Sequence, residues 1–439
     1  MSGITIAALG FGAMLLLIAL RMPVGLSMLV VGSIGYVHLS GWLPFLAYMK
    51  TNPYYQFANY TLSVIPLFIL MGAFAEQSGM ARDLFTAARG LVGHIRGGLA
   101  LAVLGACTVF GAISGSSVAT TATFGRAALP ELRRYGYDRG FATAMIAIGG
   151  VVDLLIPPSI ILVVYAIATE QNIAKLFMAA MIPGLLAVAF YSVVILIVAR
   201  RTPSIAPIQA KVGSGDRLRS LLLTWPAIVV LGLVIGGIYG GIFTPTEAAA
   251  VGTVAMLVIG VLQGRLGFRQ IKEAMTQTAQ ISAMIFIILL GSEVFDAFLA
   301  LSQLPSKAAE LVGNSGLPPY AIMALLMFFY ILLGAVMDEL AMILLTLPVF
   351  FPVVQALDFG MPADDVGIWF GILVLMVVGV GLVAPPIGLN VFVVSAIAKD
   401  VPIHETYRGV LPFVAADIVR IGLLIAFPGL ALWLVHLLN

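Results

Sequence analysis

The chain contains little charge. Only 10% of its 439 residues are Asp, Glu, Lys or Arg, whereas a soluble domain has about 25%. The 22 Lys and Arg residues nearly balance the 20 Asp and Glu residues, so a net charge of +2 gives no reason to expect a nucleic-acid partner. One cysteine, Cys107, excludes an internal disulfide. Because no Gly-Lys dipeptide occurs, the chain cannot form the phosphate-binding loop of an ATP-driven pump.

Apolar segments, by contrast, recur from end to end, and 61% of the residues are hydrophobic. Runs of about 20 residues are long enough to cross a bilayer as helices. The first run lacks preceding basic residues and a following small-residue cleavage site, so we expect a retained helix rather than a signal peptide. The sequence therefore predicts an all-α integral membrane protein in a lipid bilayer. The ten predicted spans are approximately 4–20, 23–45, 61–79, 140–170, 181–200, 221–242, 244–262, 277–299, 366–397 and 410–437.

Two further apolar segments, 98–133 and 318–356, have centres that a membrane span does not tolerate. The first centre is GAISGSSVA (111–119), and the second is GAVMDELAM (334–342). Two half-depth arms that meet at a tip buried in protein would accommodate such small and polar residues. We therefore predict two re-entrant helical hairpins.

The positions of the positive charges favour this topology. With an outside N-terminus and two re-entrant hairpins, most of the Lys and Arg residues fall in cytoplasmic segments, as the positive-inside rule requires. The loop after the second hairpin, predicted to lie outside, carries Asp358, Asp364 and Asp365 but no Lys or Arg. Counting either hairpin as a full span would destroy this bias.

The two halves of the chain resemble each other. Pro157-Pro158 follows the first hairpin and Pro385-Pro386 the second, and other short matches keep the same order. We predict one repeat over 1–200, a cytoplasmic linker over 201–219 and a second repeat over 220–439. Five spans and a hairpin in each repeat place the second copy upside down, an arrangement typical of secondary transporters.

The helix after each hairpin is expected to be broken. IGGVVDLLIPPS (148–159) and VGVGLVAPPIGLN (378–390) combine glycines with a double proline inside an apolar run. Proline leaves backbone carbonyls without partners, and in a membrane these must line a cavity or bind a cation. Two tips and two breaks can therefore meet at the midplane, where N–H groups and hydroxyls suit a substrate carboxylate.

Six segments of the chain together form a recognisable pattern. They are IPLFILMGAFAEQSG (65–79), GAISGSSVATTATFG (111–125), IPPSI (156–160), GIFTPTEAAAVG (241–252), MDELAMILLTLPVFFPV (337–353) and GLVAPPIGLNVFV (381–393). The pattern resembles the large membrane subunit of TRAP (tripartite ATP-independent periplasmic) transporters of the DctM type. The resemblance implies elevator-type import of an organic acid across the bacterial inner membrane, coupled to sodium. It also implies a small four-helix membrane subunit, expected here as a separate polypeptide, and a periplasmic substrate-binding protein.

These features predict specific site residues. We predict that Ser114, Ser159 and Asp338 border one substrate cavity for a small organic anion. The resemblance implies sodium as the coupling ion, and no other cofactor is expected. The predicted sodium-binding residues are Ser116, Ser117, Gly149, Gly150, Asp153, Pro157, Glu339, Gly381, Pro385 and Asn390.

Structural roles remain open for several of these residues. The serines of the first tip could simply allow two helices to approach closely. Asp153 and Asn390 could cap broken backbone rather than bind sodium. Either Asp338 or Glu339 could be a protonated structural group. No Lys or Arg is placed near the midplane, so the anion would be held by dipoles, hydroxyls and the sodium charge.

Other function classes fit less well. An intramembrane serine protease needs a base beside the serine, but all four histidines lie near predicted span ends. A channel has no need of inverted repeats and should have a ring of charge along its pore. We therefore expect no catalytic residue. The remaining alternative is a stand-alone sodium/carboxylate symporter, and the sequence does not identify the organic acid.

Overall fold

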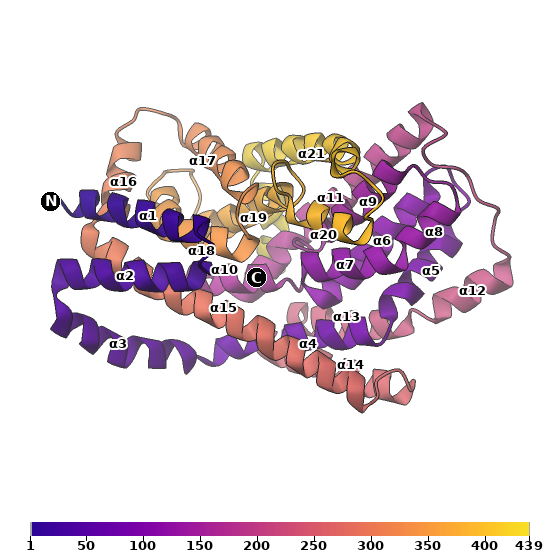
Figure 1. Ribbon diagram of the computed structural model, residues 1–439, viewed down its shortest axis with the longest axis horizontal. Coiled ribbons are helices and arrows are strands. Elements are labelled where there is room, and N and C mark those ends of the chain that lie inside the picture. The colour runs from indigo at the N-terminus through magenta and orange to yellow at the C-terminus, as the bar shows by residue number, and fades with distance from the viewer. Residues whose placement is uncertain (1, 439) are drawn as a thin grey trace.

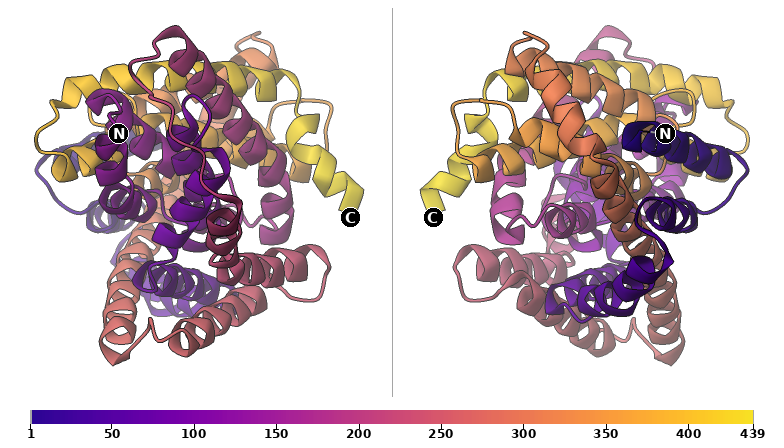
Figure 2. Two further views of the ribbon diagram at one scale, coloured as in Figure 1. Left: turned by 90° about the vertical axis from the view of Figure 1, so that its right-hand side faces the viewer. Right: turned by 90° about the vertical axis from the view of Figure 1, so that its left-hand side faces the viewer.

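The computed structural model describes residues 2–438, whose regular elements are all helical (Figures 1 and 2). The first half contains α1 (Gly3–Ala19), α2 (Val24–Ser40), α3 (Trp42–Phe57), η1 (Tyr60–Ser63), α4 (Val64–Gln77), α5 (Met80–Val92), α6 (Gly98–Ser114), α7 (Ser117–Ala127), α8 (Leu129–Arg134), α9 (Arg139–Val152), α10 (Ile160–Ala168) and α11 (Ile173–Arg201). The second half contains α12 (Ser214–Leu222), α13 (Trp225–Tyr239), α14 (Pro245–Leu262), α15 (Phe268–Ser302), α16 (Leu304–Gly313), α17 (Pro319–Gly334), α18 (Glu339–Gln355), α19 (Ala363–Gly381), α20 (Leu389–Ile397), α21 (Ile403–Ala426) and α22 (Gly429–Leu438). The all-α fold is confirmed.

Membrane-spanning length is reached by fewer helices than the ten predicted spans. Within residues 2–438, six helices are long and apolar enough to cross a bilayer, or seven if the bent pair α12–α13 counts as one span. Helices α1 and α2 are apolar but slightly shorter, with 17 residues each. The segment 140–170 is divided between α9 and α10. The ten-span topology therefore stays a prediction.

Each predicted hairpin segment folds as two helices joined by a short turn. Helix α6 ends at Ser114 and α7 begins at Ser117, with Gly115 between them at φ 60°, the left-handed conformation that glycine adopts without strain. Helices α17 and α18 are joined by residues 335–338. We call 111–117 the first tip and 334–339 the second tip. Their re-entry into a membrane stays a prediction.

The two helices after the hairpins are interrupted where the double prolines predicted. The first interruption separates α9 from α10, and the second separates α19 from α20. Both double prolines contain a cis peptide bond. Helix α19 is buried along most of its length, from Val366 to Gly381, whereas the second double proline, Pro385-Pro386, is exposed.

Helices of the two halves pack across each other. Helix α2 of the first half packs along α15 of the second, and α4 packs along α14. Figure 1 shows α3, α4, α14 and α15 along the lower edge. We call α2, α4, α14 and α15 the frame, and α6, α7, α9, α10 and α17 to α20 the hairpin bundle. The division into inverted repeats joined by 201–219 stays a prediction.

Several helices do not correspond to any predicted apolar run. Helix α5 is amphipathic, and α3 contains a proline and several polar residues, so neither forms a continuous apolar run. Helix α12 begins inside the predicted linker. The segment predicted as 410–437 is two helices, because α21 ends at Ala426 and α22 starts after Pro428. The other two unpredicted helices are α8 and α16.

Candidate substrate and cation site

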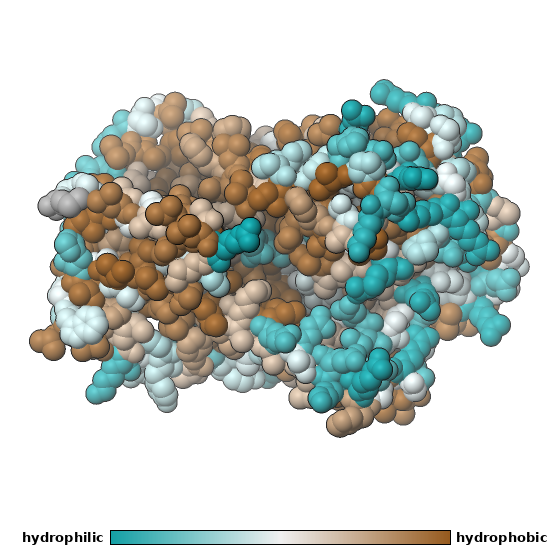
Figure 3. Space-filling model, viewed as in Figure 1, coloured by the Kyte–Doolittle hydropathy of each residue, from teal (hydrophilic) through white to brown (hydrophobic). Residues whose placement is uncertain are grey.

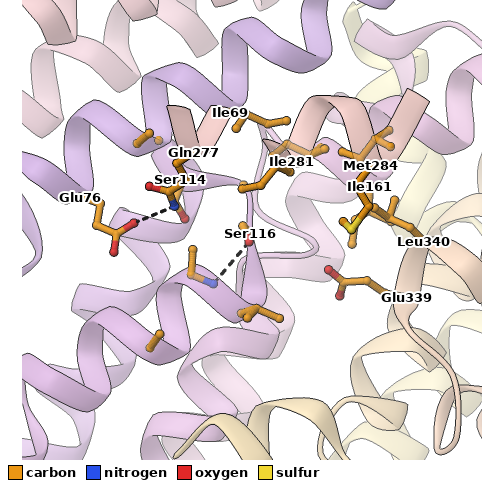
Figure 4. A pocket seen from close by; sticks show the side chains of 18 of the residues that line it. Ile69, Glu76, Ser114, Ser116, Ile161, Gln277, Ile281, Met284, Glu339 and Leu340 are labelled. Atoms are coloured by element: carbon orange, nitrogen blue, oxygen red, sulfur yellow. Dashed lines mark hydrogen bonds between the residues drawn. The ribbon is translucent and has the colours of Figure 1, made fainter. Parts of the chain in front are cut away.

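A cavity of about 560 Å³ lies between the frame and the hairpin bundle. Frame helices α4 and α15 supply one side of its lining, and the two tips with α7, α10 and the start of α20 supply the rest. Figure 3 shows the surface hollowed near its centre, between the largely hydrophobic end of the molecule and the more polar end. Both sequence-predicted tips therefore reach one cavity (Figure 4).

The first tip presents hydroxyls and the start of a helix to this cavity. Ser114 and Ser116 line it. The Ser114 Oγ lies 2.9 Å from the Thr120 Oγ1 one turn into α7, and Ser116 caps α7 by accepting from the Ala119 N–H at 3.4 Å. The N-terminus of a helix carries a positive partial charge and free N–H groups, so this wall of the cavity suits an anion.

The second tip presents two carboxylates. Asp338 is exposed at the cavity and caps α18, where its carboxylate accepts from the N–H groups of Leu340 at 3.2 Å and Ala341 at 3.4 Å. Glu339 is the first residue of α18 and is buried. The structure thus brings Ser114 and Asp338 to the same cavity, as predicted for the substrate site.

The two tips are joined by a hydrogen bond. The buried Ser117 Oγ donates to the Glu339 Oε2 at 3.1 Å. Figure 4 shows the Glu339 carboxylate pointing from α18 toward the first tip. Asp153 and Asp338 both act on Glu339 as neighbouring like charges. Glu339 and its two acidic neighbours, Asp153 and Asp338, therefore lie together at this contact.

Asp153, at the first helix interruption, is fully buried. Gly111 of α6 packs directly against it, and a Cβ added to Gly111 would overlap the Asp153 side chain. Within residues 2–438, neither carboxylate oxygen of Asp153 receives a hydrogen bond of ordinary geometry, and the Thr120 hydroxyl lies nearby as a donor. A buried carboxylate with so few donors is costly, and a bound cation would offset that cost.

A second set of buried oxygens surrounds Gly150 on α9. A Cβ added there would lie 2.6 Å from the Ser117 carbonyl oxygen and 3.1 Å from the Asn390 Nδ2, and it would overlap the Thr121 Oγ1. Asn390 donates to the Ala147 carbonyl at 3.3 Å. In the described part of the chain, the Asn390 Oδ1 and Thr121 Oγ1 receive no hydrogen bond. Glycine is required here because the backbone approaches these oxygens closely.

Other predicted residues lie behind the tips. Ser159 is fully buried and accepts from the Leu162 N–H at 3.5 Å as the cap of α10, while its neighbours Ile160 and Ile161 line the cavity in its place. Gly381 packs on the Gly334 backbone, which would lie 2.5 Å from an added Cβ. The remaining predicted positions are Gly149, which faces Cys107, and Pro157 and Pro385, which begin the two double prolines.

Sequence reasoning missed three polar residues that line the cavity: Glu76 on α4, Arg126 on α7 and Gln277 on α15. Arg126 brings a guanidinium to the cavity lining, while the expectation that no Lys or Arg lies near the membrane midplane stays a prediction. Helical periodicity contained the signal, since Ala119, Ala122 and Arg126 follow one another at spacings of three and four and line the same wall.

Comparison with known proteins decides the family. A family model described as "Tripartite ATP-independent periplasmic transporter, DctM component" matches residues 11–430. The chain belongs to the DctM family of TRAP transporters. It is 36% identical to the C4-dicarboxylate TRAP transporter large permease protein DctM of Pseudomonas aeruginosa, over 85% of this chain and 86% of the relative. It is 31% identical to the ectoine/5-hydroxyectoine large permease protein UehC of Ruegeria pomeroyi, over 98% of both chains.

The fold also resembles a solved structure, the YdaH transporter of Alcanivorax borkumensis. The TM-score is 0.65 with 16% sequence identity, and the match covers 88% of this chain and 89% of that chain. TRAP large permeases are inner-membrane proteins that work with a small membrane subunit and a periplasmic binding protein. The long apolar helices of this DctM-family chain agree with that location.

Proposed function

We propose that this DctM-family chain imports a small organic acid together with sodium ions. The observation that carries the proposal is the meeting of the two tips at Ser117 and Glu339, beside a cavity and beside buried oxygens that lack donors. In secondary transporters with inverted repeats, such irregular backbone forms the substrate and coupling-ion sites.

The charge of the cavity supports cation coupling. Its lining contains the carboxylates of Glu76, Asp338 and Glu339 but a single guanidinium, that of Arg126. When ionised, these groups would repel an organic anion, so bound cations are needed before the anion can enter. We assign one sodium ion to the neighbourhood of Asp153 and a second to the oxygens of Ser117, Thr121 and Asn390.

The first tip supports the choice of an anion. The Ser114 and Ser116 hydroxyls and the start of α7 offer donors, and a helix N-terminus is a common binding position for carboxylates. The relatives named above for C4-dicarboxylates and for ectoine transport compounds that share a carboxylate group. We infer that the substrate carboxylate lies between Ser114 and the sodium ions, with Asp338 at the cavity mouth binding its hydroxyl or amine groups.

We further propose an elevator motion. The cavity lies on the boundary between the frame and the hairpin bundle, so sliding of the bundle along the frame would carry both tips across the bilayer. The small membrane subunit, a separate four-helix polypeptide in this proposal, would hold the frame in place. The periplasmic binding protein would deliver the substrate.

The test is uptake into proteoliposomes that contain this chain and its small subunit, with the binding protein outside. We expect accumulation of radiolabelled succinate, pyruvate or gluconate only when sodium is present. Asp153→Asn should abolish uptake, whereas the matched exposed variant Asp358→Asn should not. Equal uptake with a proton gradient alone would contradict sodium coupling, and equal uptake without the binding protein would favour the stand-alone symporter.

A further inference from the structure

Three donors converge on the carboxylate of Glu76, the last acidic residue of α4. Thr123 Oγ1 donates to the Glu76 Oε1 at 3.2 Å, and the Arg126 guanidinium donates to the same oxygen at 3.1 Å. Gln277 Nε2 approaches the Glu76 Oε2 at 3.4 Å, a contact visible in Figure 4. Two of these donors belong to α7 of the hairpin bundle, and the third belongs to α15 of the frame.

This cluster stands between two cavities. Glu76 and Arg126 line the 560 Å³ cavity, and both also line a neighbouring polar cavity of about 640 Å³. The second cavity continues past Thr123 to Arg82 and to the ion pair of Asp83 with Arg265. Arg82 and Arg265 belong to segments that the charge pattern assigns to the cytoplasm, so the Glu76 cluster marks the cytoplasmic exit.

We propose that Thr123, Arg126 and Gln277 form a carboxylate-binding site at this exit, in which Glu76 stands in for the carboxylate of the departing substrate. A guanidinium, a hydroxyl and an amide are the donors that bind a carboxylate most directly. The inference rests on the proposed function, because it requires the substrate to be an organic acid. On its way out, the substrate carboxylate replaces Glu76 on Arg126, and the return of Glu76 releases it.

The exposure of the pair allows this exchange. The Arg126 side chain is 62% exposed and the Glu76 side chain 19% exposed. An ion pair so accessible to water is weak, and within residues 2–438 Arg126 makes its one ion pair with Glu76. The free-energy cost of replacing Glu76 on Arg126 by another carboxylate is therefore small. The Arg89–Glu131 pair, with both side chains 29% exposed, lines neither of the two cavities and provides a matched control.

The exchange model predicts opposite effects for the two partners. Arg126→Gln removes the cation that receives the substrate, so the internal substrate concentration at half-maximal exchange should rise about tenfold, the effect of losing one charge-assisted hydrogen bond. Glu76→Gln weakens the competitor, so that concentration should fall several-fold while the maximal rate also falls. Arg126→Lys should restore part of the affinity, and Glu131→Gln should change neither quantity.

The measurement is exchange in proteoliposomes that contain the complete transporter and are preloaded with varied unlabelled substrate. The probe is whichever of succinate, pyruvate or gluconate the wild-type complex accumulates. Shifts of both variants in the same direction would show a merely structural latch and overturn the proposal, as would no shift in either. Wild-type transporter that accumulates none of the three probes would instead overturn the organic-acid assignment itself.

Discussion

The Ser117 hydroxyl donates to the Glu339 carboxylate at 3.1 Å, which joins residues 222 positions apart. Each of the two is the first residue of the second arm of its hairpin, Ser117 in α7 and Glu339 in α18. The bond therefore connects equivalent places in the two halves. It also places the Glu339 carboxyl group beside the N-termini of α7 and α18, whose dipoles favour its ionised form.

Variants of this pair separate the charge of Glu339 from its hydrogen bond. Glu339→Gln keeps an oxygen that can accept from Ser117 but removes the negative charge. We expect the sodium concentration for half-maximal uptake to rise about tenfold, since each factor of ten corresponds to about 1.4 kcal/mol. Ser117→Ala, which keeps the charge, should raise it much less. Identical sodium dependence in the two variants would show that the charge has no special role.

The contact between the first hairpin and the broken helix depends on Gly111. An added Cβ would overlap Asp153, so Gly111→Ala should destabilise the protein by about 1–3 kcal/mol, the usual cost of overpacking, and should impair uptake. Gly105 is the matched control on the same helix, because a Cβ added there meets no atom within 4 Å. Thermal unfolding in detergent compares the two variants, and equal melting temperatures would contradict the packing argument.

A buried ion pair within α21 is linked to α11 by a hydrogen bond. Arg420 and Asp417 on α21 are 1% and 0% exposed and 2.7 Å apart, and Tyr191 on α11 donates to Asp417 at 2.6 Å. Arg420→Met leaves a buried carboxylate without its cation and should cost about 3–5 kcal/mol. The double variant with Asp417→Leu should recover most of that loss. A double variant less stable than Arg420→Met would contradict this account.

The topology can be tested with single cysteines. Cys107 is buried, so a Cys107→Ala background removes the natural thiol. Ser214→Cys in the predicted cytoplasmic linker should react only with reagents on the cytoplasmic side, and Asp358→Cys only with reagents on the periplasmic side, because both positions are exposed. Labelling of residue 214 from the periplasm would overturn the predicted inversion.

An ion pair outside the predicted membrane spans should make the stability of the protein depend on pH. Arg133 of α8 donates to Asp400 in the turn before α21 at 2.7 Å, and this bond lowers the pKa of Asp400 below its usual value near 3.8. The stabilisation is present above the ordinary pKa and is lost as pH falls through the lowered one. Asp400→Asn should therefore lower the melting temperature slightly at pH 7 and by less at pH 3. An equal effect at both pH values would exclude the charge as its cause.

The long helices, the hairpin tips and the helix interruptions could be predicted from the residues in each segment alone. Apolar runs predicted most of the long helices, because a run of consecutive apolar residues fixes both the length and the hydrophobicity of a helix. The small and polar centres located both tips, and the double prolines located both interruptions, since proline stops a helix wherever it occurs. Amphipathic helices such as α5 were missed because their apolar residues recur every three or four positions on one face and do not form a consecutive apolar run.

The contacts between these residues depend on how the helices pack in three dimensions. The rotation of α7 about its axis brings Arg126 to the cavity and to Glu76, although the sequence placed it beyond the tip. The crossing of the two halves brings Asn390 of α20 onto α9, and it leaves Ser159 as a buried helix cap. Such contacts depend on how side chains of distant helices pack against one another, and hydropathy along one chain does not encode that packing.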